Sequence, residues 1–160
     1  IHELIQFLSA SPPQDYIHVA QRVLQGYPNS LEEDLHAHAQ RVLTAEHLQF
    51  LFHPAALVEV PVTAALPELG GAEISGAIDR LLISESRILA VDFKSNRLVP
   101  QRAEDTPEGI LRQMGAYAAA LSQIYPDRLV ETAIVWTETA ELMSLSHDIV
   151  RQALQRSHIS

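Results

Sequence analysis

The chain has 160 residues, a common size for one domain, and its 47% hydrophobic content is enough to build a buried core. It contains no cysteine, which excludes disulfides, iron–sulfur clusters and zinc held by thiolates. Any metal must therefore be held by carboxylates, histidines, carbonyls or water. No apolar run approaches the roughly 20 residues that span a bilayer, so we expect no membrane contact. The absence of cysteine fits a cytoplasmic setting.

The net charge of −9 is unusual for a protein that binds phosphate groups, but the charge is unevenly distributed. Residues 1–60 hold two arginines against seven acidic residues, whereas residues 94–112 hold four basic residues against three acidic ones. We therefore expect any anion to bind near residues 94–112, with much of the affinity supplied by another domain or a partner. Because the chain starts without an initiator Met, we also expect it to be a fragment of a longer protein.

The order of predicted elements indicates an α/β fold with a mixed sheet flanked by helices and preceded by a helical segment. Residues 1–50 predict helices over about 2–10, 14–25 and 31–46, the last with a capping box formed by Ser30 and Glu33. Three strands follow over 57–63, 74–83 and 87–93, with a Pro/Gly loop over 64–72. Thr106 and Pro107 then predict the start of a helix that ends at 125–127, followed by strands 130–137 and 142–145 and a final helix, capped by Ser146, to about 156.

Four histidines near the helical part could suggest a metal site: His36, His38, His47 and His53. Residues two apart do not share a helix face, so the His36-x-His38 pair is poorly placed to bind one ion. We interpret these residues as surface histidines.

The connection between strands 74–83 and 87–93 is so short that the two must form an antiparallel hairpin. If Glu85-Ser86 is the loop, Asp79 lies directly opposite Asp92, and Lys94 points to the same face. Opposed carboxylates in a buried sheet repel each other, and a divalent cation such as Mg²⁺ or Mn²⁺ would remove that repulsion. The alternative is a hairpin with solvated carboxylates and Lys94 as an ion-pair partner. A turn one residue longer or shorter would place the two aspartates on opposite faces.

Three motifs in order resemble the RecB-type nuclease module of the PD-(D/E)xK superfamily: Gly76-x-Ile78-Asp79, Asp92-x-Lys94 and Gln113-x-x-x-Tyr117. The stretches around Asp92 and Gln113 are most similar to the C-terminal nuclease domain of AddA-type helicase–nuclease subunits. The resemblance covers nearly the whole chain. It implies a restriction-endonuclease-like core over 57–156, preceded by a helical part over 1–50, in a single nuclease domain.

The resemblance also implies roles for individual residues. Asp79 and Asp92 resemble the metal-binding carboxylates, the Phe93 carbonyl a further ligand, and Lys94 the catalytic lysine. Glu59 resembles the acidic residue of the first core strand, and His2 resembles a histidine that reaches the metal from an upstream helix. Gln113, Tyr117, Arg97 and Arg112 would contact DNA or support Lys94. Several of these residues have a plainer alternative: an exposed strand Glu59, a solvated His2, a core Tyr117 and surface arginines at positions 97 and 112.

These roles imply a Mg²⁺-dependent deoxyribonuclease, with Mn²⁺ as a possible cofactor and no iron–sulfur cluster. The expected substrate is the end of single-stranded DNA, delivered by helicase domains of the same chain with an AddB-like subunit during double-strand break repair. One alternative is a restriction-type or junction endonuclease of the same superfamily. The other is a non-catalytic module that keeps the nuclease fold to bind DNA or a partner.

Overall fold

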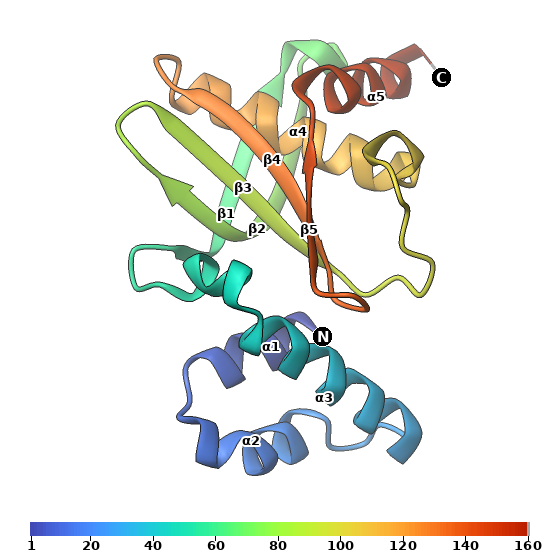
Figure 1. The fold of residues 1–160 in the computed structure, drawn as a ribbon. Helices are drawn as coiled ribbons and strands as arrows, with labels where there is room; N and C mark the ends of the chain where they lie inside the picture. The colour runs from blue at the N-terminus through green and yellow to red at the C-terminus, as the bar shows by residue number, and fades with distance from the viewer. Residues whose placement is uncertain (160) are drawn as a thin grey trace.

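The N-terminal third of the protein is helical (Figure 1). The computed structural model describes residues 1–159, and the side chains of residues 1–157. The helices in this third are α1 (His2–Ser9), α2 (Tyr16–Val23) and α3 (Asn29–Thr44), with the 3₁₀ segments η1 (Pro13–Asp15) and η2 (Glu46–Phe52). No helix in the described part of the chain is long and apolar enough to cross a membrane.

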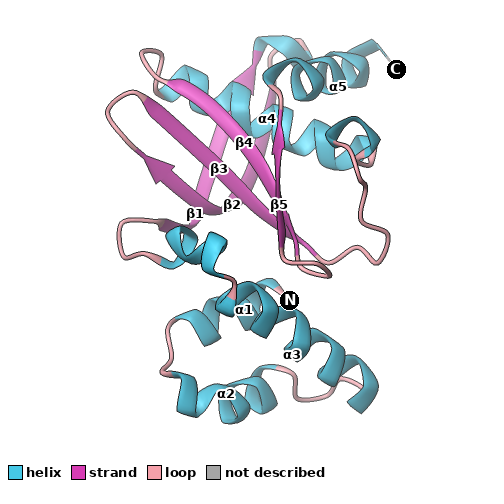
Figure 2. Ribbon diagram, viewed as in Figure 1, coloured by secondary structure: helices cyan, strands magenta, loops and turns pink. Residues whose placement is uncertain are grey.

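The rest of the chain forms a five-stranded mixed sheet in the order β1-β2-β3-β4-β5 (Figure 2). Only β3 and β4 are parallel; the other neighbours are antiparallel. The strands are β1 (Leu57–Leu66), β2 (Ala72–Ile83), β3 (Arg87–Lys94), β4 (Leu129–Trp136) and β5 (Glu141–Leu145), and the helices are α4 (Glu108–Ile124) and α5 (His147–Ile159). This confirms the expected α/β fold with a mixed sheet flanked by helices.

Each face of the sheet has its own hydrophobic core, because side chains alternate between faces along a strand. Ile88 and Ala90 of β3 pack with α4 and α5, whereas Val91 and Phe93 pack with α1, α2, α3 and η2. Figures 1 and 2 show the two helical layers on opposite sides of the sheet. Asp92 lies two residues after Ala90 on the same strand, so its side chain points to the same face of the sheet, toward α4.

Two of the expected helix caps are wrong. Helix α3 begins at Asn29 after Pro28 and α4 begins at Glu108 after Pro107, and neither helix has a side-chain cap hydrogen bond. In both places a proline fixes the backbone just before the first helical turn, so the Ser30–Glu33 and Thr106 caps are not formed. The Ser146 cap is confirmed, because its hydroxyl accepts a hydrogen bond from the Ile149 amide at 3.3 Å.

The expected Pro/Gly loop over 64–72 is also shorter than predicted. β1 and β2 pair as far as Leu66↔Ala72, and only η3 (Pro67–Leu69) with Gly70 and Gly71 makes the turn. Both glycines have positive φ, 65° and 86°, which suits glycine because it has no Cβ. Cross-strand pairing thus overrides the weak strand propensity of Ala64 and Ala65.

His38 is not a surface histidine. Its exposed fraction is 2%, its Nδ1 lies 3.0 Å from Thr137 Oγ1, and its Nε2 lies 2.7 Å from a carboxylate oxygen of Glu138. The neighbouring Arg41 donates to the Glu138 carbonyl, and His47 Nε2 lies 2.7 Å from the Ala140 carbonyl. These contacts attach the helical part to the β4–β5 turn, which lies just beyond Lys94.

Candidate metal and catalytic centre

The β2–β3 hairpin has the expected register. The pairs Ile83↔Ile88 through Arg80↔Val91 place Glu85 and Ser86 in the loop, and the Ser84 amide donates to the Arg87 carbonyl at 2.9 Å. The expectation that Asp79 and Asp92 form the next pair is corrected, because the ladder ends at Arg80↔Val91.

Beyond that point β2 departs from β3, and the Asp79 side chain replaces the ladder. Asp79 Oδ2 accepts a hydrogen bond from the Phe93 amide at 2.9 Å. Ile78 and Leu81 both join the core beneath α4 although they are three residues apart, so the alternation of β2 shifts by one residue between them. On the neighbouring strand, Glu59 has a φ of +47° at the same level. This irregularity turns the Asp79 carboxylate toward β3.

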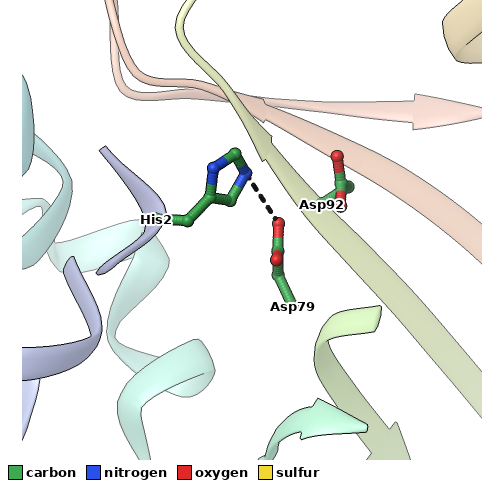
Figure 3. Close-up of side chains that lie close together, drawn as sticks. All are labelled: His2, Asp79 and Asp92. Carbon is green, nitrogen blue, oxygen red and sulfur yellow. Dashed lines mark ion pairs between the residues drawn. The ribbon is translucent and has the colours of Figure 1, made fainter. Parts of the chain in front are cut away.

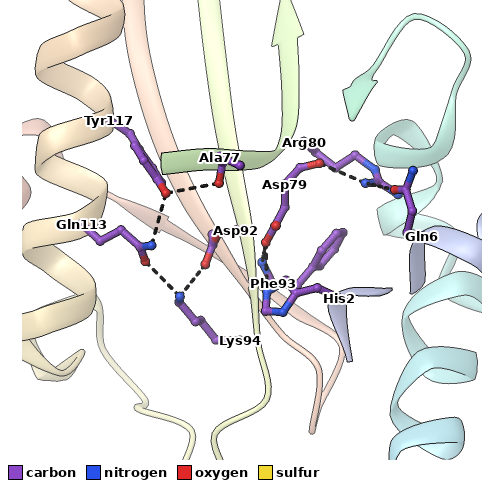
Figure 4. Close-up of polar contacts among 10 residues, drawn as sticks. All are labelled: His2, Gln6, Ala77, Asp79, Arg80, Asp92, Phe93, Lys94, Gln113 and Tyr117. Atoms are coloured by element: carbon purple, nitrogen blue, oxygen red, sulfur yellow. Dashed lines mark hydrogen bonds and ion pairs between the residues drawn. The ribbon is translucent and has the colours of Figure 1, made fainter. Parts of the chain in front are cut away.

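Lys94 lies at the centre of a chain of polar contacts that runs from β3 to α4 and back to β2 (Figure 4). Its ammonium lies 2.7 Å from Asp92 Oδ2 and donates to Gln113 Oε1 at 2.9 Å. Gln113 Nε2 donates to Tyr117 Oη at 3.3 Å, and Tyr117 donates to the Ala77 carbonyl at 3.2 Å. The one-turn spacing of Gln113 and Tyr117 on α4 makes this possible.

The contact between Tyr117 and β2 requires a glycine at position 76. A Cβ at this position would lie 2.7 Å from Tyr117 Oη and 3.1 Å from its Cε1, which is closer than van der Waals contact. The glycine of the Gly76-x-Ile78-Asp79 motif therefore leaves room for the tyrosine of the Gln113-x-x-x-Tyr117 motif.

His2 reaches the same place from the first residue of α1 (Figure 3). Its Nε2 lies 3.1 Å from Asp79 Oδ2, and its side chain is 44% exposed. One donor atom from each of His2, Asp79 and Asp92 lies within 4.8 Å of the other two, which forms a candidate metal cluster.

The electrostatics of the cluster are those of two carboxylates held too close together. Burial, reinforced by hydrogen bonding with Asp79 and by its charge, raises the pKa of Asp92 to about 6 against the opposing effect of Lys94. Burial alone would raise the pKa of Asp79, but hydrogen bonds from His2, Asp92 and the Phe93 amide outweigh it and lower that pKa. The hydrogen bond to Asp79 raises the pKa of His2 despite burial, and the Phe93 backbone adds to this effect.

This donor set fits a divalent cation. One imidazole nitrogen and two carboxylates suit Mg²⁺ or Mn²⁺, with Mn²⁺ the more tolerant of nitrogen. A cation among them would remove the Asp79–Asp92 repulsion and leave the Lys94 ammonium alongside. Phe93 lies beside both Asp79 and His2 through its backbone, so its carbonyl is placed near the cluster.

Three other residues considered from the sequence lie outside the cluster. The Glu59 side chain is exposed, and the candidate metal cluster among the described residues consists of His2, Asp79 and Asp92 without it. Arg97 is exposed and lines a shallow cleft with Ser30 and Asp34. Arg112 is exposed and lies 3.9 Å from Glu108 on its own helix.

Sequence reasoning missed Arg80, which is 3% exposed and follows Asp79 directly. It donates from Nε to the Leu51 carbonyl at 3.1 Å and from Nη1 to the Asp79 carbonyl at 3.0 Å. The available signal was a charged residue within an otherwise apolar strand segment, because arginines are rarely buried without partners.

Comparison with known proteins identifies a family that matches this chain. Residues 2–157 match a family model described as the PD-(D/E)XK nuclease superfamily. No curated protein matches the sequence. Among solved structures, the crystal structure of SSO0001 is similar, with 15% sequence identity and a TM-score of 0.44 over 99% of this chain and 69% of that one.

Proposed function

This chain belongs to the PD-(D/E)XK nuclease superfamily, and we propose that its site hydrolyses the phosphodiester bonds of DNA with the aid of a divalent cation. The observation that carries the proposal is the convergence of His2, Asp79 and Asp92 within 4.8 Å, with the Lys94 ammonium 2.7 Å from Asp92. The proposed cofactor is Mg²⁺, with Mn²⁺ as a substitute.

His2, Asp79 and Asp92 would hold the cation, with the Phe93 carbonyl as a further oxygen ligand. When bound, the cation supplies Lewis-acid chemistry, which lowers the pKa of water and polarises a phosphoryl oxygen. We propose direct attack by water, without a covalent enzyme intermediate.

Lys94 would orient the reacting groups. An ammonium has three N–H donors; one contact goes to Asp92 and one to Gln113. The remaining N–H can donate to the attacking water or to a phosphate oxygen, because the side chain is 20% exposed. Gln113 and Tyr117 restrict the lysine to that direction through their own hydrogen bonds. Burial raises the pKa of Tyr117 against the opposing hydrogen bond from Gln113, so its hydroxyl keeps the proton that it donates to Ala77.

The finer assignment follows from the motif resemblance. We propose a RecB-type exonuclease module of an AddA-like helicase–nuclease that acts on single-stranded DNA ends during double-strand break repair. The net charge of −9 supports an arrangement in which helicase domains or an AddB-like subunit supply most of the DNA affinity. Arg97 and Arg112 are the proposed phosphate contacts near the site.

The test is Asp92→Asn, with Asp127→Asn as the matched control on an exposed turn. Degradation of an end-labelled single-stranded oligonucleotide is measured with Mg²⁺, with Mn²⁺ and with a chelator, for this chain and for the proposed helicase–nuclease. We expect Asp92→Asn to lower the rate by about 10²-fold or more, and Asp127→Asn to leave it unchanged. Undiminished cleavage by a pure Asp92→Asn preparation would refute the site.

The rival function is a binding module that retains the nuclease fold. It predicts that the unaltered protein binds the same oligonucleotide without cleaving it under any metal condition. A duplex with internal labels separates the remaining alternative, because an endonuclease of the same superfamily releases internal fragments whereas an exonuclease releases only terminal products.

A further inference from the structure

Arg80 joins the strand that carries Asp79 to the helix that carries His2. Its Nη1 donates to Gln6 Oε1 at 3.4 Å (Figure 4). Its Nη2 donates to Ser9 Oγ at 3.5 Å, and both acceptors lie on α1. Its Nε donates to the Leu51 carbonyl of η2. The guanidinium therefore contacts two separate helical segments from one position on β2.

The acceptors on α1 lie on the same helix face as His2. Gln6 follows His2 by four residues and Ser9 follows Gln6 by three, which places all three along one stripe. Two adjacent residues of β2 thus contact the two ends of that stripe, with Asp79 at His2 and Arg80 at Gln6 and Ser9. Holding one end of the stripe orients the other.

Apolar packing alone would not set this orientation. Leu4, Ile5 and Leu8 bury the face of α1 beside this stripe, but hydrophobic contact is non-directional and allows an eight-residue helix to rotate or slide. Hydrogen bonds depend on distance and angle, and so restrict both movements.

The surroundings of Arg80 hold its own position firmly. Its guanidinium carbon lies 5.3 Å from the Phe52 ring centroid and 5.4 Å from that of Phe93, and these two rings stack with an interplanar angle of 1°. Its hydrogen bonds go to uncharged acceptors, while Asp79 and Glu59 attract it over longer distances. Burying the Arg80 cation costs more free energy than burying an apolar side chain, because an apolar side chain would pack there without desolvating a charge.

We propose that Arg80 is a positioning residue that fixes α1 against β2 and so places His2 in the metal cluster. The inference rests on the proposed function, because it presumes that His2 is a metal ligand. Arg80 acts through His2 and does not itself touch the cation or the DNA.

The test is a double-mutant cycle on Mn²⁺ affinity, measured by calorimetric titration of the protein without DNA. Arg80→Met keeps most of the side-chain volume and removes the hydrogen bonds. We expect it to weaken Mn²⁺ binding by about 10- to 100-fold, as loss of supporting contacts around metal ligands does, and His2→Ala to weaken it at least as much. In the His2→Ala background, Arg80→Met should then have no further effect. The matched control is Arg87→Met, which removes an exposed arginine that pairs with Glu131.

Unchanged Mn²⁺ affinity in Arg80→Met overturns the proposal, and so does an equal loss with and without His2, because that result indicates general damage to the site. If Arg80→Met does not fold by circular dichroism, the pair Gln6→Leu and Ser9→Ala tests the same contacts from α1, with the same expected dependence on His2. If the unaltered protein binds no Mn²⁺, both the metal centre of the proposed function and this proposal are refuted. Mn²⁺ binding that depends on His2 but not on Arg80 or its acceptors would sink this proposal alone.

Discussion

Asp92→Asn should stabilise the metal-free protein while it lowers the cleavage rate. Burial and the neighbouring Asp79 raise the pKa of Asp92 from its ordinary 3.8 to about 6. A shift of about 2 units, at about 1.4 kcal/mol per unit, corresponds to roughly 3 kcal/mol. That part of the free energy of unfolding is fully present below pH 3.8, where the Asp92 carboxyl is protonated in both the folded and the unfolded chain. It is lost as the pH rises through about 6, where the carboxyl ionises in the folded protein.

At pH 8 the ionised Asp92 therefore destabilises the folded state, and the neutral asparagine does not. Because asparagine also forms a weaker contact with Lys94 than a carboxylate does, we expect a net gain of about 2 kcal/mol. For a chain of this length that is an increase in Tm of about 4–8 °C.

The assay is thermal and urea unfolding at pH 8 and pH 5, with a chelator and then with Mg²⁺ or Mn²⁺. In the chelator, Asp92→Asn should be more stable than the unaltered protein at pH 8, and the gap should shrink at pH 5. Saturating cation should stabilise the unaltered protein by about 3 kcal/mol at 100 times its Kd, and Asp92→Asn far less. An Asp92→Asn variant that is equally or less stable at pH 8 in the chelator would refute the proposed repulsion at this site.

Three further predictions concern the contacts around the site. Gln113→Leu should lower the cleavage rate by about 10- to 100-fold without changing Mn²⁺ affinity, because Gln113 contacts Lys94 and not the metal cluster. A parallel loss of Mn²⁺ binding in calorimetry would contradict this prediction. Gly76→Ala should lower the free energy of unfolding in urea by about 1–3 kcal/mol, because the new Cβ overlaps Tyr117; an unchanged urea midpoint would show that the ring moves freely. His38→Ala should lower the free energy of unfolding by about 1–3 kcal/mol, because it leaves the buried Thr137 hydroxyl without its side-chain partner and removes the contact with the half-buried Glu138 carboxylate. A free energy of unfolding at neutral pH within about 0.5 kcal/mol of that of the unaltered protein would argue against this role.

The sequence alone was sufficient to predict the order of helices and strands and the register of the central hairpin. Local signals suffice there, since the two-residue loop Glu85-Ser86 determines which residues pair across β2 and β3. Asp92 and Lys94 are two residues apart, so they lie on one face of a strand. Gln113 and Tyr117 are four residues apart, so they lie on one face of a helix. The motif resemblance then named the superfamily that the family model matches.

The convergence of the cluster required the tertiary structure. His2 and Asp79 are 77 positions apart in the chain, and no periodicity relates them; they meet because α1 packs beneath the sheet with Gln6 and Ser9 held by Arg80. The departure of β2 from β3 after Arg80, which turns Asp79 toward the Phe93 amide, likewise depends on non-local pairing with β1. His38 illustrates the same limit, because its burial follows from a partner 99 residues away. Local patterns report the preferences of neighbouring residues, whereas contacts between distant segments exist only once the whole chain has packed.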